Sequence, residues 1–249
     1  MSRTALITGA TSGIGLATAR ILAKNSFELI LCGRRSERLS NLKKELSVYT
    51  NITTLSFDVG NRNEVESSLG ELTKSTSIDL LINNAGNAHG LHPINSGDVD
   101  DWDKMMDINV KGLLYVSKSV IPGMVKKGSG HIINIGSIAG KEVYPNGNVY
   151  CASKHAVDAI SKGMRMDLNA YGIRVSEINP GLVETEFSEV RFKGDSERAK
   201  RVYEGYKALQ PEDIADIILF IVTRPSHVNL ADIVVLPTAQ ASSTIVNKN

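Results

Sequence analysis

The sequence predicts an α/β fold, namely a single doubly wound Rossmann-type domain with a seven-stranded parallel sheet and helices on both faces. Seven short apolar runs alternate with longer amphipathic stretches, which is the pattern of successive βαβ units. Each run is almost continuously apolar, as expected for a strand that is covered on both faces. The 249 residues contain no internal repeat and no Pro-, Gly- or Ser-rich linker. We therefore expect one domain spanning residues 1–249.

Each apolar run is assigned to a strand and each amphipathic stretch to a helix. The predicted strands are Ala5–Thr8, Leu29–Cys32, Thr54–Phe57, Leu80–Asn83, Ile132–Ile135, Val175–Ile178 and Ile233–Leu236. The predicted helices cover residues 14–24, 36–48, 61–74, 100–120, 149–171 and 211–223. Asn61 and Pro211 are typical helix starts, and Gly172 is a typical helix stop. Right-handed crossovers bring the carboxyl ends of the strands to one edge of the sheet, where ligands bind in such folds.

Composition excludes several classes of function. The formal net charge is +1, whereas nucleic-acid binding needs a concentrated basic surface. The longest apolar stretch, Ile217–Val222, falls far short of the roughly 18 to 20 residues that span a bilayer. We expect no signal peptide, because the amino terminus leads almost directly into the first predicted strand. Cys32 and Cys151 form no metal-binding or redox motif and are interpreted as buried free thiols. We expect a cytoplasmic protein with no nucleic-acid or membrane partner.

A glycine-rich turn follows the first predicted strand and leads directly into a helix. Such a turn lets backbone N–H groups approach a pyrophosphate at the positive end of the helix dipole. Its glycines are not spaced as in the usual GxGxxG fingerprint, since three residues separate the first two and one separates the last two. The turn is predicted to bind a cofactor through Gly9, Thr11, Ser12, Gly13, Ile14 and Gly15.

Charge at the end of the second strand indicates which nicotinamide cofactor binds. NAD enzymes usually place an acidic residue here for the ribose 2′-hydroxyl, whereas a 2′-phosphate requires cations. This chain carries Arg34 and Arg35 and no acid at that point. The alternative is that Arg34 and Arg35 only lie at the solvated start of a helix, although two cations there oppose the helix dipole. We predict NADP rather than NAD.

Tyr150 and Lys154 are four residues apart in a predicted helix and share one face. A nearby ammonium favours the phenolate, so we expect Lys154 to lower the pKa of Tyr150 and to make it a general acid/base. Ser137 lies thirteen residues before Tyr150, just after a strand. Its hydroxyl is suited to stabilise a developing oxyanion.

A Tyr–Lys pair at this spacing also arises by chance, and a second one exists at Tyr203 and Lys207. Thirteen residues before Tyr203 stands Val190, which has no hydroxyl. We therefore interpret Tyr203 and Lys207 as surface residues without a role.

The glycine turn, Asn83–Gly86, Ser137, Tyr150 with Lys154, and Pro180–Gly181 stand in an order that resembles the short-chain dehydrogenase/reductase family over essentially the whole chain. This resemblance implies that Ser137, Tyr150 and Lys154 are catalytic. It also implies that Asn109 completes a tetrad by holding a water beside the lysine. The cofactor half would cover about residues 1–140, and the catalytic and substrate elements about 109–249.

The resemblance implies further cofactor contacts. Asp58 and Val59 would touch the adenine, and the turn after the fourth strand would lie beside the adenine ribose. The segment from Pro180 would orient the nicotinamide, and Tyr150 and Lys154 would lie beside the nicotinamide ribose. The residues implied are Asp58, Val59, Asn83, Ala85, Gly86, Tyr150, Lys154, Pro180, Gly181, Val183 and Thr185.

Three segments, 32–39, 189–195 and 236–240, are similar to those of NADP-dependent 3-hydroxy acid dehydrogenases. The resemblance implies oxidation of the 3-hydroxyl of small acids of the serine, allo-threonine or 3-hydroxybutyrate type, or the reverse reduction. We expect substrate contacts from Ser137, Tyr150 and Arg191, with Arg191 holding the carboxylate. The alternative is that Arg191 and Lys193 only solvate a mobile loop.

Several questions stay open at this level. A 3-oxoacyl thioester reductase is the nearest alternative enzyme, and a non-catalytic NADP-sensing protein is the alternative from another class. No role is assigned to the 87–98 loop with His89 and His92, and no metal site is expected because a third ligand is missing. The resemblance suggests a homotetramer formed through the helices at 100–120 and 149–171.

Overall fold

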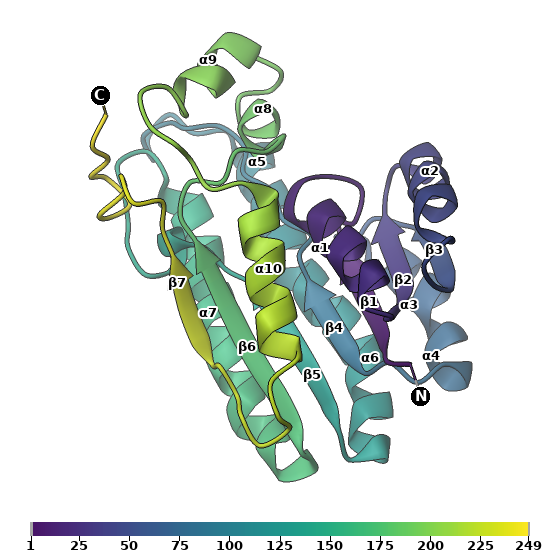
Figure 1. The fold of residues 1–249 in the computed structure, drawn as a ribbon. Helices are drawn as coiled ribbons and strands as arrows, with labels where there is room; N and C mark the ends of the chain where they lie inside the picture. The colour runs from purple at the N-terminus through teal and green to yellow at the C-terminus, as the bar shows by residue number, and fades with distance from the viewer. Residues whose placement is uncertain (1, 249) are drawn as a thin grey trace.

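The computed structural model describes residues 2–248 and contains one seven-stranded parallel sheet in the order β3-β2-β1-β4-β5-β6-β7 (Figure 1). Every pair of neighbouring strands is parallel. The strands are β1 (Thr4–Thr8), β2 (Glu28–Gly33), β3 (Ile52–Ser56), β4 (Leu80–Asn83), β5 (Gly130–Ile135), β6 (Ile173–Pro180) and β7 (Asp232–Val235). All seven predicted strands are confirmed, with shifts at their ends.

The strand order places a reversal at the centre of the sheet. The chain runs outward from β1 to β2 and β3, and then returns to place β4 on the other side of β1. At such a point the two loops that leave β1 and β4 diverge and open a crevice above the carboxyl edge. The fold therefore fixes the position of a binding site before any side chain is considered.

Two layers of helices cover the sheet. One apolar core lies under α1 (Gly13–Lys24), α2 (Ser36–Leu46) and α10 (Pro211–Val222). The other lies under α3 (Arg62–Gly70), α6 (Leu113–Lys127) and α7 (Asn148–Leu168). Figure 1 shows α1 and α10 in front of the sheet and α6 and α7 behind it. This arrangement explains why the strands are apolar on both faces.

The predicted helix boundaries have physical causes in the structure. The Asn61 side chain accepts hydrogen bonds from the backbone N–H groups of Asn63 and Glu64 and so caps α3. At the start of α10, Gln210 and Asp213 cap each other reciprocally and Pro211 occupies the first turn. After α7 and the short 3₁₀ turn η3 (Asn169–Tyr171), Gly172 has a left-handed φ of 67° and ends the helical run.

The predicted helix over 100–120 is confirmed as a helical run, but it is not uniform. The structure has α5 (Val99–Met106), a π-helical turn η1 (Asp107–Gly112) and then α6. A π-turn inserts one residue without interrupting the apolar pattern strongly, so residue periodicity does not detect it. The predicted helix over 61–74 is likewise divided, into α3 and α4 (Leu72–Ser75).

Two short helices in the last third of the chain were not predicted, α8 (Phe187–Arg191) and α9 (Ser196–Arg201). They lie above the carboxyl edge of the sheet (Figure 1). We call residues 185–203 the covering segment. The 3₁₀ turn η2 (Ile138–Gly140) follows β5 at the same edge. Among residues 2–248, no helix combines the length and apolar character needed to cross a bilayer.

Candidate active site

A cleft of about 460 Å³ opens along the carboxyl edge of the sheet. Loops after β1, β2, β3, β4, β5 and β6 line it, together with the start of α7 and the covering segment. Most of the predicted site residues meet here: Gly9, Thr11, Ser12, Gly13, Ile14, Arg34, Arg35, Asp58, Val59, Ala85, Gly86, Ser137, Tyr150, Lys154, Pro180, Gly181, Val183, Thr185 and Arg191. Gly15, Asn83 and Asn109 lie outside the lining of the cleft.

The turn after β1 requires glycine for reasons of conformation and space. Gly9 has a φ of +65° and Gly13 a φ of +50°, where side chains are rarely tolerated. Gly15 does not line the cleft, but a Cβ there would lie 2.4 Å from the Gly9 carbonyl oxygen. Gly15 therefore lets α1 begin close to the turn, so that the first N–H groups of the helix face the cleft.

At one end of the cleft, Arg35 is held by several polar groups. Its guanidinium donates to the hydroxyls of Thr11 (3.0 Å) and Ser12 (2.8 Å) and to the Glu186 carboxylate (2.8 Å). Arg38 also donates to Glu186, at 2.7 Å. Arg34 is largely exposed and contacts Asp58 only loosely, at 3.4 Å. A cluster of three guanidinium groups and two hydroxyls therefore stands where the second strand ends.

Glu186 and Arg38 were not found from the sequence. They are 148 residues apart, and no local pattern links an acid after β6 to a cation in α2. The pKa of Glu186 lies below its ordinary value because hydrogen bonds from Arg35 and Arg38 outweigh the effect of burial.

Asn83 does not face the cleft. Its side-chain amide donates to Ser117 and to Asn134, both at 2.9 Å, in a buried network below the cleft floor. The next residue, Asn84, lines the cleft instead and donates to the carbonyl oxygens of Thr8 and Gly9. β4 ends at Asn83, and the side chain that reaches the cleft is that of the next residue, Asn84. A match to the sequence motif alone does not distinguish Asn83 from Asn84.

Tyr150, Ser137 and Lys154 line the same part of the cleft. The Tyr150 ring is buried and packs edge-on against Phe187, with the ring centroids 5.6 Å apart. The Lys154 Nζ donates to the Ile135 carbonyl oxygen at 2.9 Å. The Ser137 Oγ accepts from the Ala139 N–H, which leaves the hydroxyl hydrogen free to donate into the cleft.

The backbone at Ser137 is fixed from below. The Ser137 N–H donates to the Asn179 side chain at 3.0 Å, and the Asn179 amide donates to Asp232 at 2.8 Å. Lys141 completes this chain with a 2.7 Å contact to Asp232. Asn179 is fully buried, so these contacts hold the position of Ser137 in a region shielded from water.

Burial dominates the ionisation of the two central groups. It raises the pKa of Tyr150 above its ordinary value, and the groups that act in the opposite direction are Ser137 and Arg191. Burial lowers the pKa of Lys154 to about 8, while the buried Glu177 acts in the opposite direction. The pKa of Tyr150 is thus raised and not lowered as expected, because loss of hydration outweighs the hydrogen bond with Ser137 and the charge of Arg191.

Asn109 lies in the π-helical turn and is almost fully buried. Its side chain accepts from the Asn87 N–H and donates to the Asn87 carbonyl oxygen, both at 2.8 Å, and donates to Ser153 at 3.0 Å. A Cβ on Gly86 would lie 3.3 Å from the Asn109 Oδ1 and 3.6 Å from the Lys154 Nζ. Asn109 thus joins the loop after β4 to the neighbourhood of Lys154.

Arg191 lies beside Tyr144 and Tyr150 in the cleft. Its guanidinium lies 5.4 Å from the centroid of the Tyr150 ring and 5.5 Å from that of Tyr144. The Tyr144 hydroxyl accepts from it at 2.8 Å, and the Gly90 carbonyl oxygen accepts at 3.3 Å. The Gly90 N–H in turn donates to the Arg191 carbonyl oxygen at 2.9 Å. The alternative of a merely solvated arginine does not fit these contacts.

The 87–98 loop acquires a structural role from these contacts, because Gly90 pairs with the covering segment. Lys193 adds a second link through contacts of 3.3 Å to Asp98 and 2.9 Å to Asp101. His89 is half-buried, and burial lowers its pKa. Among residues 2–248, no group of three or more metal-ligating side chains could hold a metal ion.

The interpretation of Tyr203 as a surface residue is wrong. Its side chain is half-buried and lines the cleft, and its hydroxyl contacts Ser188 and Val183. Lys207 is exposed, as expected. The two residues lie outside a helix, so the four-residue spacing does not place them on one face. Both cysteines are buried and free, as predicted.

The fold, the glycine turn and the Ser–Tyr–Lys arrangement define a class of protein. The family model for short chain dehydrogenases matches residues 3–196, and the chain belongs to this family. It is accordingly an oxidoreductase that acts on CH–OH groups.

Individual relatives agree along the whole chain. The chain is 47% identical over 238 residues to the "NADP-dependent 3-hydroxy acid dehydrogenase YdfG" of Salmonella typhi, covering 95% of each protein. It is 42% identical over 245 residues to "Sulfoacetaldehyde reductase 2" of Chromohalobacter salexigens, covering 98% of this chain and 97% of that protein. A solved structure, the closed form of serine dehydrogenase complexed with NADP+, superposes with a TM-score of 0.90 at 42% identity, covering 97% and 98% of the two chains.

The buried Lys154 makes a prediction about stability. Its pKa falls from an ordinary 10.5 to about 8 on folding, so the ammonium opposes folding fully below pH 8. This effect fades between pH 8 and 10.5, as the unfolded chain also loses the proton. Lys154→Met should stabilise the fold at pH 7 by about 1 to 3 kcal/mol, allowing for the lost bond to Ile135. The gain in the free energy of unfolding should fall below half at pH 10, as measured by urea unfolding.

A Lys154→Met variant that is less stable than the unaltered protein at pH 7 would contradict this account. The control is Lys162→Met, which replaces an exposed lysine on the same helix.

Proposed function

We propose that this protein is an NADP-dependent dehydrogenase of small 3-hydroxy acids, such as serine, allo-threonine or 3-hydroxybutyrate, which also reduces the matching carbonyl compounds. The observation that carries this proposal is the Arg191 guanidinium, held 5.4 Å from the Tyr150 ring by Tyr144 and Gly90. A fixed cation beside the predicted acid/base suits a substrate that carries an anionic group close to its reacting hydroxyl.

The cleft fits NADP. The positive-φ glycines and the start of α1 leave room for a pyrophosphate against backbone N–H groups. Arg34 and Arg35, with the hydroxyls of Thr11 and Ser12, offer the donors that a 2′-phosphate needs. Of the relatives named above, the 3-hydroxy acid dehydrogenase is described as NADP-dependent and the serine dehydrogenase structure contains NADP+. When bound, the cofactor supplies the hydride acceptor or donor.

The chain's own residues would then divide the remaining work. Tyr150 exchanges a proton with the substrate oxygen, and Ser137 donates a hydrogen bond to that oxygen. The raised pKa of Tyr150 keeps its proton available for reduction of a carbonyl. In the oxidising direction the phenolate must form, and the Ser137 hydroxyl and the Arg191 guanidinium favour it. Asn109 fixes the loop beside Lys154, as its bonds to Asn87 support.

The structural surroundings weigh against the alternatives. A 3-oxoacyl thioester is uncharged at its reacting end and would leave the Arg191 guanidinium without an anionic partner. A protein that only senses NADP would not need Ser137, Tyr150 and Lys154 to line one part of the cleft. A sulfonate would satisfy Arg191 as well as a carboxylate does, so sulfoacetaldehyde belongs among the substrates tested.

Assembly and compartment also belong to the proposal. The outer face of α7 exposes Ala152, His155, Ala159 and Met166, and α6 exposes Leu114. Apart from His155, these residues are small or apolar, and they support pairing of helices in a homotetramer, for which light scattering should give about four times the 26.9 kDa chain mass. Two free, buried cysteines are compatible with the reducing cytoplasm that we propose.

Replacement of Tyr150 tests the reaction. Tyr150→Phe should lower kcat by roughly 100- to 10,000-fold while leaving NADP affinity nearly unchanged, because the hydroxyl acts in the transition state. The measurement is absorbance of the reduced nicotinamide with a panel of 3-hydroxy acids, sulfoacetaldehyde and neutral ketones. Tyr49→Phe, an exposed tyrosine, serves as the control. Retention of more than about a tenth of the activity would refute the acid/base role.

Removal of both cleft arginines tests the cofactor preference. The double change Arg34→Ala and Arg35→Ala should weaken NADP binding much more than NAD binding, since each charge-assisted contact contributes about 1.5 to 3 kcal/mol. Fluorescence titration with both cofactors measures the ratio. Arg20→Ala removes a surface guanidinium paired with Glu45 and should change neither affinity. Equal losses for NADP and NAD would show that the arginines do not contact the 2′-phosphate.

Arg191 tests the substrate class. Arg191→Ala should lower kcat/KM for anionic substrates by roughly 30-fold, which corresponds to a charge-assisted contact of about 2 kcal/mol. A neutral ketone has no anionic group to lose and should be affected little. Tyr144→Phe removes one support of Arg191 but keeps the guanidinium, so its effect should be smaller. Parallel losses on anionic and neutral substrates would mean that Arg191 orders the loops and does not bind the substrate.

A further inference from the structure

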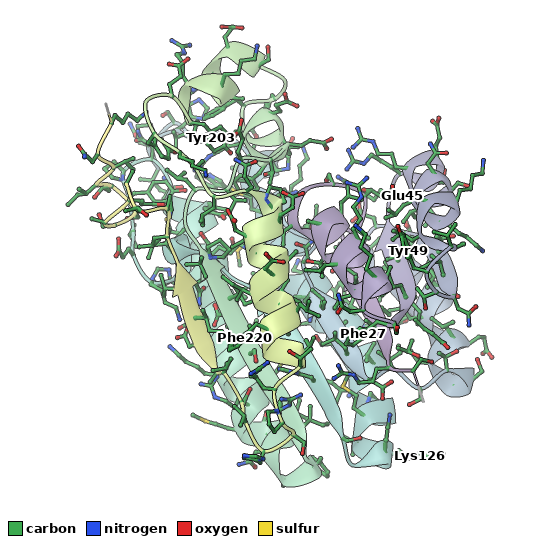
Figure 2. The ribbon with its side chains drawn as sticks, viewed as in Figure 1. Phe27, Glu45, Tyr49, Lys126, Tyr203 and Phe220 are labelled. Atoms are coloured by element: carbon green, nitrogen blue, oxygen red, sulfur yellow. The ribbon has the colours of Figure 1, made fainter. Side chains whose placement is uncertain are left out.

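Tyr203 contacts two parts of the cleft that the proposed function uses separately. One is the helix α8, which carries Arg191, and the other is the stretch after β6, which contains Val183. Tyr203 lies in the segment between α9 and α10, and Figure 2 labels it beside these helices. Val202 and Tyr203 both line the cleft. Burial raises the pKa of Tyr203, and the hydrogen bond with Ser188 acts in the opposite direction. The phenol therefore remains protonated and can donate a hydrogen bond.

The two contacts of the Tyr203 hydroxyl have defined directions. It donates to the Val183 carbonyl oxygen at 3.0 Å, and it lies 2.8 Å from the Ser188 Oγ. A phenol has one hydrogen, and the Val183 carbonyl can only accept, so Ser188 must be the donor to Tyr203. The result is a directed chain from Ser188 through Tyr203 to Val183, in which each hydrogen bond polarises the next.

The two ends of this chain have different surroundings. Ser188 is buried in α8, the helix that also carries Arg191 three residues later. Val183 lies in the stretch after β6, where Leu182 and Glu184 pair with the backbone of Leu209. The backbone groups on either side of Val183 are thus already paired with Leu209, and the Val183 carbonyl oxygen accepts from the Tyr203 hydroxyl.

We propose that Tyr203 is a positioning residue that couples the covering helix α8 to the Val183 segment beside the nicotinamide. With its hydroxyl in place, the covering helix with Arg191 and the wall next to the nicotinamide adopt their closed positions together. The proposal rests on the proposed function in taking Val183 as a neighbour of the nicotinamide. Without the hydroxyl, α8 and the Val183 segment would open independently, and the ring and the substrate anchor would no longer be aligned at the same time.

Tyr203→Phe is the direct test, because it removes one oxygen and keeps the ring. Tyr206→Phe is the matched control, since the Tyr206 hydroxyl donates only to the nearby Val202 carbonyl oxygen. Amide hydrogen exchange of α8 and the NADPH dissociation constant are measured first, because neither depends on turnover. A neutral hydrogen bond lost from a closed state changes its population by about five- to tenfold. We expect amide exchange in α8 to become faster, and the NADPH dissociation constant to rise, by that factor in Tyr203→Phe and not in Tyr206→Phe.

Turnover provides an independent readout with any carbonyl substrate that the protein reduces. Tyr203→Phe should lower kcat about five- to tenfold and raise the isotope effect of deuterated NADPH, because a misaligned ring slows the hydride step. Ser188→Ala should reproduce the effect, and the double variant should lose no more than either single one, since the three groups act as one chain.

Two results would overturn the proposal. One is equality of Tyr203→Phe and Tyr206→Phe in exchange of α8, NADPH affinity and isotope effect. The other is a drop in thermal midpoint for Tyr203→Phe with an unchanged isotope effect, which would indicate a general loss of stability. Failure of the proposed function would look different, because the unaltered protein would then not bind NADPH or not turn over 3-hydroxy acids.

Discussion

The structure depends on the contact between the turn after β1 and the turn after β4. The Thr8 hydroxyl accepts from the N–H groups of Asn84 and Ala85, and the Asn84 side chain donates back to the carbonyl oxygens of Thr8 and Gly9. A Cβ at Gly9 would lie 3.0 Å from the Ala85 Cα. These four hydrogen bonds hold the two diverging loops at a fixed separation. The width of the cleft, the start of α1 and the position of the wall formed by Gly86 all follow from this contact.

A second constraint is that the part of the cleft lined by Tyr150 and Lys154 is shielded from water. Tyr150 and Lys154 are both buried. Burial raises the pKa of Tyr150 and lowers that of Lys154, and both shifts favour the neutral form of the side chain. Below them, Glu177 is buried between charged neighbours, and burial raises its pKa to about 7. A Cβ on Gly136 would lie 2.4 Å from the Glu177 carboxylate. The site therefore holds ionisable groups that an apolar core would exclude, at a cost in folding free energy that the two large apolar clusters offset.

Polar contacts join the covering segment to three other parts of the protein, besides the packing of Phe187 on Tyr150. Glu186 links it to α2, Lys193 links it to the start of α5, and Tyr203 links it to the stretch after β6. Exposed ion pairs contribute little to stability. The pairs of Glu186 with Arg35 and Arg38 are partly exposed, so they position the segment over the cleft more than they stabilise the fold.

The sequence by itself determined the seven strands, their parallel arrangement and the edge where the ligand site lies. Continuous apolar runs and glycine-rich turns act locally, and the right-handed crossover leaves few alternative topologies. It also located Ser137, Tyr150 and Lys154, because the spacing of the pair and the strand before the serine are properties of short segments.

Tertiary structure decided what depends on residues far apart in the chain. The link from Glu186 to Arg35 and Arg38, the support of Arg191 by Gly90 and Tyr144, and the contacts of Tyr203 all join segments with no shared sequence pattern. The pKa shifts of Tyr150 and Lys154 have the same origin, since burial is the sum of many distant neighbours. Hydrophobic periodicity specifies which face of an element is buried, but the polar contacts of a side chain are fixed only when the elements pack.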